Sequence, residues 1–482
     1  MWYKGFYSPT KSINRKGDAM SRIVTEIVSC ENQIHQFFLN QKIGSLLKRS
    51  NINKEKGIAP VAVFRTLFTT VFTGKNLFRT LESSDGTCCM AKDTVYRFLN
   101  SVHANWRRLL LLLSSRMIGR QIEPLTGTAT MKVLIVDDTL YRRNRSKRVE
   151  LLSRVFDHID KRYYRGFRML VLGWSDGITF LPVSFSLLGS SKEKHCYVPS
   201  RTDIDRRTNG AKRRQEGIHK APDVLVELVA QAMAEGVRAR HLLFDSWFAF
   251  PATIRRLLAQ GMHTICMLKV TEKIHYGYQG EKLHLAALYK KIRKRCGRAK
   301  ILASIIVEIG EDDKGSPVPA KIVFVRDRRT KKWLALLSTD MTLTDEDIVK
   351  TYKRRWDIEV FFKMVKSFLN LAKECQGRSY DALVAHTTVV CCRYMMLALA
   401  GRMNNDPRTL GSLFHASCDE LKQAGFTEAL ALLLTLLEQA LATIVGISKE
   451  LIRSLVERFL EELPPIYKAR LLLPGHIHTV SC

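Results

Sequence analysis

The sequence predicts an α/β protein in which a mixed β-sheet lies between an N-terminal and a C-terminal helical region. Two short apolar runs, each ending in aspartate, have the length of buried strands. Helical patterns separate these runs, as in proteins whose helices cover a sheet with parallel strands. Apolar residues make up 46% of the 482 residues, so the chain can form a sizeable core.

Residues 1–125 are predicted to be helical, with apolar residues at helical spacing in segments 61–72 and 92–113. The segment AKDTVYRFLN has Asp93 as a capping residue and an apolar side, which leaves three polar residues facing outward: Tyr96, Arg97 and Asn100. This pattern fits the recognition helix of a helix-turn-helix and, nearly as well, an ordinary bundle helix. The charge of the whole chain slightly favours the first interpretation.

A core is predicted to begin in residues 126–269. The run MKVLIVDD predicts a buried strand ending at Asp137 and Asp138, and MLVLGWSDGITFLPVSFSLL contains two apolar runs around a hairpin turn signal, Ser175-Asp176-Gly177. The basic segment 190–222, which includes KRR at 212–214, is predicted to be a mobile loop. The remaining elements are a helix at 223–235, a strand in RARHLLFDSWF ending at Asp245, a helix at 250–260 and a strand in HTICMLKV.

The rest of the chain is predicted to form three parts. Residues 270–340 alternate in the manner of strands and are interpreted as a β-rich insertion. Residues 341–400 return to the core with a helix at about 347–370, and residues 401–482 form a helical C-terminal region rich in Leu and Ala.

The charge of the chain indicates a polyanionic partner. Lys and Arg number 77 against 46 acidic residues, which gives a net charge of +31. An anionic membrane surface is the alternative, but no basic amphipathic helix or lipidation signal is evident. Nucleic acid is therefore the predicted partner.

Cysteine usage and hydropathy indicate a soluble cytoplasmic protein. The 11 cysteines show neither CxxC nor zinc-finger spacing, so they are predicted to be reduced thiols packed as small apolar side chains. The N-terminus lacks the apolar core of a signal peptide. Charges interrupt the longest apolar stretches, at 109–113, 387–392 and 429–437, so no membrane span is predicted.

One helical segment, TYKRRWDIEVFFKMVKSF, combines an apolar side with a row of functional groups. At about 100° per residue, the row falls within an arc of about 60°; its members are Tyr352, Arg355, Glu359 and Lys366. A solvated surface is the alternative interpretation. The nearby aromatic Trp356 and the carboxylates elsewhere in the chain favour a row that holds a metal ion and a nucleic-acid phosphate together.

Three carboxylates are predicted to form the metal site. Asp137, or its neighbour Asp138, and Asp245 close two strands, where ligands gather in open α/β sheets, and Glu359 can pack across that edge. Such a set suits Mg²⁺, and two ions about 4 Å apart can activate a water and stabilise the leaving oxygen in phosphoryl transfer. Each aspartate could instead cap a turn, but the set of three beside a basic row favours metal binding.

These residues resemble a known family. The pattern Y-x2-R-x3-E-x6-K, together with IVDDT and LLFDSWF, is similar to the signature of DDE-type bacterial insertion-sequence transposases of insertion-sequence family four. The resemblance covers roughly residues 130–400. It implies an RNase H-like core with a β-rich insertion between the second aspartate and the glutamate. The second motif reads Asp-Ser-Trp-Phe where many relatives have Asp-Arg-x-Tyr, so the contacts around this aspartate can differ.

The resemblance also implies roles for individual residues. Asp137, followed by Thr139 as in the Asp-x-Thr pattern, matches the first catalytic and metal-binding aspartate, with Asp138 as the alternative; Asp245 matches the second aspartate, and Glu359 the glutamate. The residues implied in DNA binding are Tyr352, Arg355, Lys366, Arg354, Lys363 and Trp333. Trp333 is placed where an indole can stack on a flipped base, and packing inside the insertion is the equal alternative.

The predicted function is cut-and-paste DNA transposition. Two Mg²⁺ ions, which Mn²⁺ can replace, would support cleavage at terminal inverted repeats and joining of the 3′ ends to target DNA. Double-stranded DNA, a homodimer in the synaptic complex and a cytoplasmic location at the bacterial nucleoid follow from the same resemblance. The alternatives are an RNase H-like nuclease without strand transfer and a catalytically silent, transposase-derived DNA-binding protein.

Overall fold

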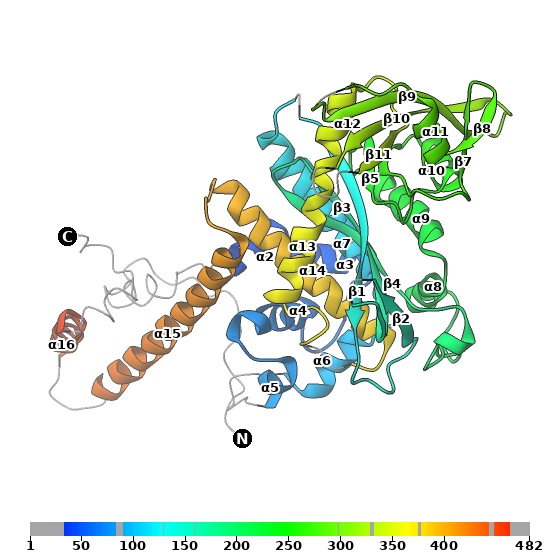
Figure 1. Ribbon diagram of the computed structural model, residues 1–482. Helices are drawn as coiled ribbons and strands as arrows, with labels where there is room; N and C mark the ends of the chain where they lie inside the picture. The colour runs from blue at the N-terminus through cyan, green and yellow to red at the C-terminus, as the bar shows by residue number, and fades with distance from the viewer. Residues whose placement is uncertain are drawn as a thin grey trace. The chain divides into compact units, whose positions relative to one another are not determined.

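The computed structural model describes residues 33–82, 90–128, 130–158, 160–296, 298–327, 332–374, 377–442 and 448–462 (Figure 1). The chain divides into two compact units, one formed by residues 37–414 and the other by residues 1–36 with 415–482. The described helices of the second unit include most of α15 (Leu410–Ala442) and α16 (Lys449–Glu462). All of the residues predicted to be functional lie in the first unit.

The first unit contains a mixed, 11-stranded sheet, which confirms the predicted α/β class and is consistent with an RNase H-like fold. The strand order is β2-β3-β1-β5-β6-β11-β10-β9-β7-β8, and β4 also pairs with β3. The core strands are β1 (Val133–Arg142), β2 (Ser153–Asp157), β3 (Arg162–Ser175), β4 (Phe180–Leu188), β5 (His241–Phe244) and β6 (His263–Met267). β1, β5 and β6 are parallel, whereas β2, β3 and β4 pair antiparallel.

The predicted hairpin joins β3 to β4 at Ser175-Asp176-Gly177. Gly177 has a φ of 89°, a conformation that favours glycine. The buried Asp176 accepts hydrogen bonds from the backbone N–H groups of Ile178 and Thr179 at 3.0 and 2.7 Å. These bonds hold the turn in register.

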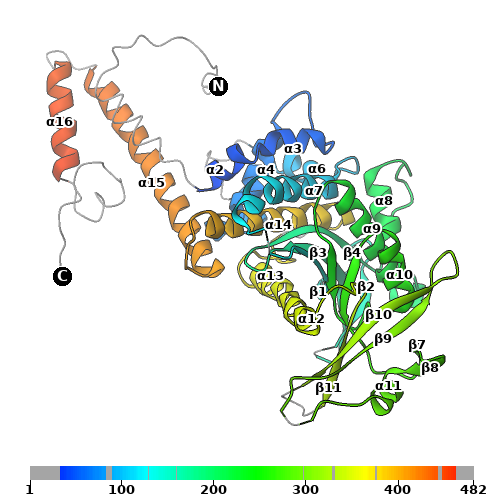
Figure 2. The same cartoon turned by 90° about the horizontal axis from the view of Figure 1, so that it is seen from above.

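Helices cover both faces of the core sheet (Figure 2). One face carries α12 (Asp345–Tyr352), α13 (Trp356–Ser367) and α14 (Tyr380–Met403); the other carries α9 (Ala221–Ala234) and α10 (Pro251–Ala259). This double cover explains why every residue of β4 is buried and why the strands read as continuous apolar runs.

Residues 275–338 extend the sheet. The elements are β7 (His275–Tyr278), β8 (Glu281–His284), α11 (Leu285–Lys291), β9 (Ile301–Glu311), β10 (Pro317–Arg326) and β11 (Trp333–Ser338). β11 pairs antiparallel with β6, so these strands continue the core sheet, an arrangement that alternation in the sequence does not reveal. Their status as an insertion stays a prediction.

The described N-terminal elements are helical. They are α2 (Gln33–Asn40), α3 (Ile43–Arg49), α4 (Pro60–Thr69), the 3-10 turn η1 (Thr70–Thr73), α5 (Leu77–Glu82), α6 (Lys92–Leu99), α7 (Trp106–Met117), the π-helical turn η2 (Ile118–Ile122) and the 3-10 turn η3 (Glu123–Leu125). The predicted helix 92–113 is two helices, because Asn105 caps α7 by accepting a hydrogen bond from the N–H of Arg108. Asp93 lies in the first turn of α6 rather than at its cap.

The structure tests the helix-turn-helix prediction only in part. The segment before α6, residues 83–89, lies outside the described residues, as does the vicinal pair Cys88 and Cys89. Within α6, Val95 and Leu99 are buried and Arg97 is exposed, as either interpretation requires.

The prediction of a mobile loop at 190–222 is wrong, because part of it folds as the 3-10 turn η4 (Glu193–His195) and α8 (Asn209–Gly217). Two of its basic residues are buried. Arg214 Nε donates to Glu150 at 2.6 Å and Nη2 donates to Asp381 at 2.7 Å, and Arg213 also pairs with Asp381. Carboxylates that are distant in the sequence therefore turn an apparently solvated basic run into a core element.

Helix α14 also differs from the prediction for apolar stretches. By length and composition it could cross a membrane, with a mean hydropathy of 1.5 over its most apolar window, and that window is buried inside the protein. Arg393, in the middle of the helix, is buried and paired with Glu374.

Candidate active site

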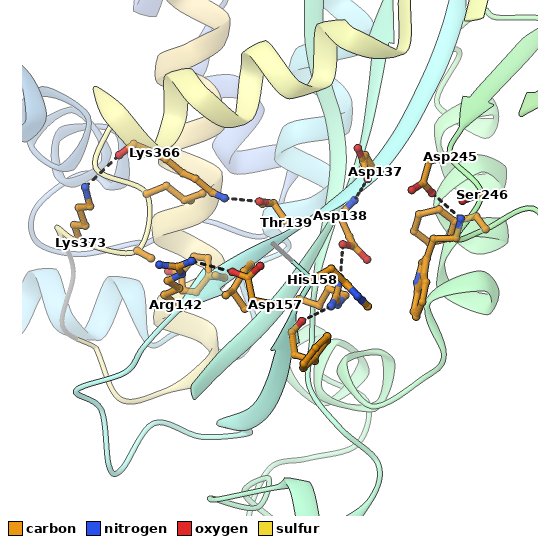
Figure 3. A pocket seen from close by; sticks show the side chains of 18 of the residues that line it. Asp137, Asp138, Thr139, Arg142, Asp157, His158, Asp245, Ser246, Lys366 and Lys373 are labelled. Carbon is orange, nitrogen blue, oxygen red and sulfur yellow. Dashed lines mark hydrogen bonds and ion pairs between the residues drawn. The ribbon is translucent and has the colours of Figure 1, made fainter. Parts of the chain in front are cut away.

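Asp137 and Asp245 lie level on neighbouring parallel strands. Ile135 of β1 is opposite Leu243 of β5, so two further residues along each chain bring the two aspartates to the same edge. Figure 3 shows Asp137 and Asp138 projecting from β1, with Asp245 across from them. β1 continues past Asp137 to Arg142, so the prediction that this strand ends at the aspartates is wrong. Its parallel pairing with β5 ends at Ile135, and Asp245 directly follows β5, so both carboxylates lie just beyond this pairing. Their catalytic roles stay a prediction.

The alternation of β1 separates Asp137 from Asp138. Asp137 and Thr139 contact the residues of α13 and the turn before it, whereas Asp138 contacts Arg168 of β3. Asp137 therefore shares a face with Glu359, and Asp138 does not. This geometry supports Asp137 as the first aspartate, an assignment that stays a prediction.

The predicted continuous helix at 347–370 is interrupted. A 3-10 turn, η5 (Lys353–Arg355), separates α12 from α13. Arg354 donates to the carbonyl of Met131, and Arg355 turns toward β1. Both arginines of the turn thus contact β1 or the segment just before it, and the turn departs from the ideal helical arc assumed from the sequence.

Arg355 joins the first aspartate to the glutamate. Its Nη1 donates to Asp137 Oδ2 at 3.0 Å, and its Nη2 donates to Glu359 Oε1. Within the described residues, no three His, Cys, Asp or Glu side chains gather closely enough to hold a metal ion. The structure thus differs from the predicted direct cluster, because a guanidinium one turn before Glu359 lies between the two carboxylates and pairs with both.

The ionised form of Asp137 is unfavourable even with Arg355 as its partner. Burial and the nearby Asp245 raise the pKa of Asp137 to about 7, against the opposing effects of Arg355 and a hydrogen bond from the N–H of Asp138. Burial also raises the pKa of Asp138, whose Oδ1 accepts from Arg168 at 2.7 Å. The Oδ2 atom of Asp138 is buried and has no hydrogen-bond partner among the residues that the structure describes. Burial and neighbouring carboxylates therefore oppose ionisation of both aspartates more than the paired arginines favour it.

A cleft of about 760 Å³ opens at this edge (Figure 3). Its acidic lining consists of Asp137, Asp138, Asp157 and Asp245, and its basic lining includes Arg142, Arg168, Lys269, Lys366 and Lys373. Cations that surround carboxylates in an open cleft suit an anionic ligand such as a phosphodiester. Glu359 is not part of the cleft lining in this conformation.

Lys366 and Tyr352 point toward the same edge. Lys366 Nζ donates to Thr139 Oγ1, and burial together with Arg142 lowers the pKa of Lys366. The Tyr352 hydroxyl is buried and has no hydrogen-bond partner in the described part of the chain, and burial raises its pKa. Both side chains are thus held beside β1 with capacity for a further polar contact.

The other residues predicted to bind DNA are dispersed. Lys363 is exposed on α13, and Arg354 is turned away toward Met131. Trp333 stacks on Tyr289 with 4.4 Å between ring centroids and meets Phe324 edge-on at 5.4 Å. These contacts favour the packing interpretation of Trp333, which is also absent from the cleft lining.

The residues at this edge fit a divalent cation. The available donors are carboxylate oxygens, the ligands that Mg²⁺ and Mn²⁺ prefer. A cation between Asp137 and Asp245 would relieve the repulsion that raises the pKa of Asp137. Direct participation of Glu359 requires its ion pair with Arg355 to open.

Several cleft residues were missed by the sequence analysis. Lys269 follows β6, so the strand-end rule that identified Asp245 could have identified it as well. Trp247 lies two residues after Asp245 and is 46% exposed. Arg168 and His158 had no sequence signal, because pairing of β3 with β1 and of β2 with β3 brings them to the cleft.

Comparison with known proteins supports the same chemistry. Residues 84–300 match the model of a family described as DDE superfamily endonuclease. The match includes both aspartates, ends before Glu359 and covers less than half of the chain. No curated protein matches the chain.

The fold, the paired aspartates and this match together support an enzyme of the DDE type that acts on DNA, either a nuclease or a transposase. Domains of this type generally use divalent metal ions.

Proposed function

We propose that this protein is a bacterial DNA transposase that cleaves the ends of its element and joins them to target DNA. The observation that carries the proposal is that Asp137 and Asp245 lie at one sheet edge beside the Tyr-Arg-Glu-Lys row. The guanidinium of Arg355 lies between Asp137 and Glu359 and donates to both. The resemblance to insertion-sequence family four extends this proposal to terminal inverted repeats, two Mg²⁺ ions and a dimer at synapsis.

The proposed roles of the site residues follow from their charges. Asp137, Asp245 and Glu359 would hold the divalent cations. When bound, these ions supply activation of a water or hydroxyl and stabilisation of the leaving oxygen. Arg355 and Lys366 would bind the phosphate backbone, because both lie beside the carboxylates with donor groups.

Arg355 gives this site a route from its present arrangement to a DNA-bound one. A phosphate in the cleft would offer the guanidinium an alternative anionic partner with bidentate geometry, in place of the two carboxylates. Transfer of Arg355 to that phosphate would free Glu359 to turn toward the aspartates. The side chains of Arg355 and Glu359 are 19% and 32% exposed, so the pair can open without unpacking the core.

The test uses the purified full chain and a labelled plasmid carrying the coding region with its natural flanks. With Mg²⁺, the wild type should cut at the flanks and join the released 3′ ends to a second plasmid. Glu359→Gln should lower cutting by at least about 10²-fold, since metal-centred stabilisation is worth several kcal/mol. Glu346→Gln, an exposed carboxyl on α12, is the matched control and should cut normally.

The outcomes separate the alternatives. Full-rate cutting by Glu359→Gln would overturn the role of that residue. Nicking without joined products would favour a nuclease without strand transfer. Binding of the flanks with no metal-dependent cutting would indicate a catalytically silent DNA-binding protein.

A further inference from the structure

The edge strand β2 and the adjoining half of β3 expose a face that combines arginines with aromatic rings. The strand register places Arg154 opposite Arg165 and Phe156 opposite Tyr163, so these four side chains share one face. His158 continues the row beyond β2 and meets Trp247 of the cleft at 5.5 Å between rings. We call this set the β2–β3 ledge; its members are Arg154, Phe156, His158, Tyr163, Arg165 and Trp247.

The arginines of the β2–β3 ledge have no carboxylate partner among the described residues. Arg154 and Arg165 are directly opposite each other, and like charges at such positions destabilise a strand pair. Arg154 lies over the ring of Tyr163 at 3.9 Å, and Arg165 lies over Tyr197 at 4.8 Å. By contrast, the nearby Arg142 is paired with two aspartates. Among the described residues, these two positive charges are therefore not neutralised by a carboxylate.

The aromatic rings of the ledge lead from the outer edge of the sheet into the cleft. Tyr163 and Phe156 are 5.0 Å apart, Phe156 and His158 are 5.0 Å apart, and Trp247 follows. Tyr163 is 51% exposed and Trp247 46%. The guanidinium of Arg168 lies 5.9 Å from the centre of the Trp247 ring. Large rings exposed beside unpaired guanidinium groups are the groups that bind unpaired bases and their phosphates.

We propose that the β2–β3 ledge binds a single-stranded segment of DNA that leaves the cleft. Bases would stack on Trp247 and Tyr163, and phosphates would contact Arg154 and Arg165. The inference rests on the proposed function for the identity of the nucleic acid as DNA. A single strand fits because stacking requires bases that are not already paired within a duplex. Trp247, two residues after Asp245, would hold the first base beyond the cut.

The test measures anisotropy of a labelled 20-nucleotide thymidine strand and of a blunt duplex with the full chain in EDTA. Trp247→Ala and Tyr163→Ala should each weaken single-strand binding by about 5- to 100-fold, since stacking is worth about 1–3 kcal/mol per base. Duplex binding should change by less than about twofold. Trp247→Phe should retain most of the affinity.

Phe459→Ala is the matched control, because Phe459 on α16 is 47% exposed and belongs neither to the ledge nor to the proposed site; it should leave single-strand binding unchanged. Arg154→Gln and Arg165→Gln should each reduce the slope of log K against log salt by about 0.7. Thermal unfolding of every variant checks that the fold is intact.

Three results would overturn the inference: unchanged single-strand binding in Trp247→Ala, equal losses for single strand and duplex, or altered self-association of the DNA-free protein in the ledge variants. The last would make the ledge an interface between copies of the chain. Because EDTA excludes metal-dependent cutting, ledge binding in a protein that never cuts DNA would support this inference and contradict the proposed function. Normal cutting by a protein whose ledge does not bind single strands would support the proposed function and contradict this inference.

Discussion

Two buried carboxylate sites in this protein differ in how completely their charge is neutralised. Glu374 accepts from Arg393 at 2.6 and 2.9 Å and contacts His386 at 3.1 Å. Although burial opposes ionisation, Arg393 and His386 lower the pKa of Glu374 to about 2. At the sheet edge, burial and Asp245 raise the pKa of Asp137 to about 7 despite Arg355.

The difference separates a structural site from a candidate functional one. Arg393 also donates to the carbonyl groups of Leu67 and Phe68, so the Glu374 cluster joins α14 to α4 with its charges satisfied. At the Asp137 edge, burial and a neighbouring carboxylate disfavour the ionised form of Asp137, and the edge opens into a cleft lined by both carboxylates and cations. A desolvated carboxylate whose ionised form is disfavoured by its own fold can be stabilised by a cation from solution.

The largest expected effect is on catalysis. Asp245→Asn should reduce DNA cutting by at least about 10³-fold, because it removes a proposed metal ligand. The same change should raise the melting temperature of the metal-free protein slightly, because it removes the repulsion of Asp137. Cutting assays and calorimetry measure the two quantities. Asp203→Asn, at an exposed ion pair, is the control; a large loss of stability in Asp245→Asn would contradict the comparison.

Glu374→Gln should have the opposite effects: a large loss of stability and little loss of DNA cutting. Removal of one partner from a buried pair costs about 3–5 kcal/mol of unfolding free energy, whereas cutting per folded molecule should persist. The folded pKa of Glu374 lies below its unfolded value, so its contribution is fully present above about pH 4.5 and is lost as the pH falls toward 2. Urea unfolding at pH 7 and pH 3.5 should therefore show a smaller difference from wild type at the lower pH. An equal difference at both values would contradict the assignment.

The smallest expected effect is stabilisation by Mg²⁺. At 100 times its dissociation constant, a bound ion raises the free energy of unfolding by about 2.7 kcal/mol. Wild type and Glu374→Gln should both gain melting temperature with Mg²⁺, and Asp137→Asn should not. KCl at equal ionic strength controls for screening. The same gain in Asp137→Asn would place the cation elsewhere.

The sequence predicted the strands β1 and β5 because local apolar patterns determine them, but it placed the end of β1 too early. The apolar runs before Asp137 and Asp245 predict buried strands, and helices between such runs predict parallel pairing at one edge. The signature segment was also placed beside that edge. Its 3-10 turn was not predicted, because Arg354 and Arg355 there contact residues distant in sequence: Met131, two residues before β1, and Asp137 on β1.

The arginines were harder to interpret from sequence. The KRR run of α8 and the residues Arg154 and Arg165 look alike in composition, yet Arg213 and Arg214 are buried with carboxylates, and the ledge arginines are not. The net charge of the chain predicted a polyanionic partner and did not distinguish these two groups of arginines. Only the positions of Glu150 and Asp381 distinguish them.

The sequence by itself determined which residues can reach the sheet edge, since strand and helix periods are set by neighbouring residues. The tertiary structure decided which charges meet: Arg355 with Asp137 and Glu359, Arg393 with Glu374, and no carboxylate with Arg154 among the described residues. The physical reason is that electrostatic interactions and burial depend on distance in space, and residues more than 200 positions apart in the chain can be in contact.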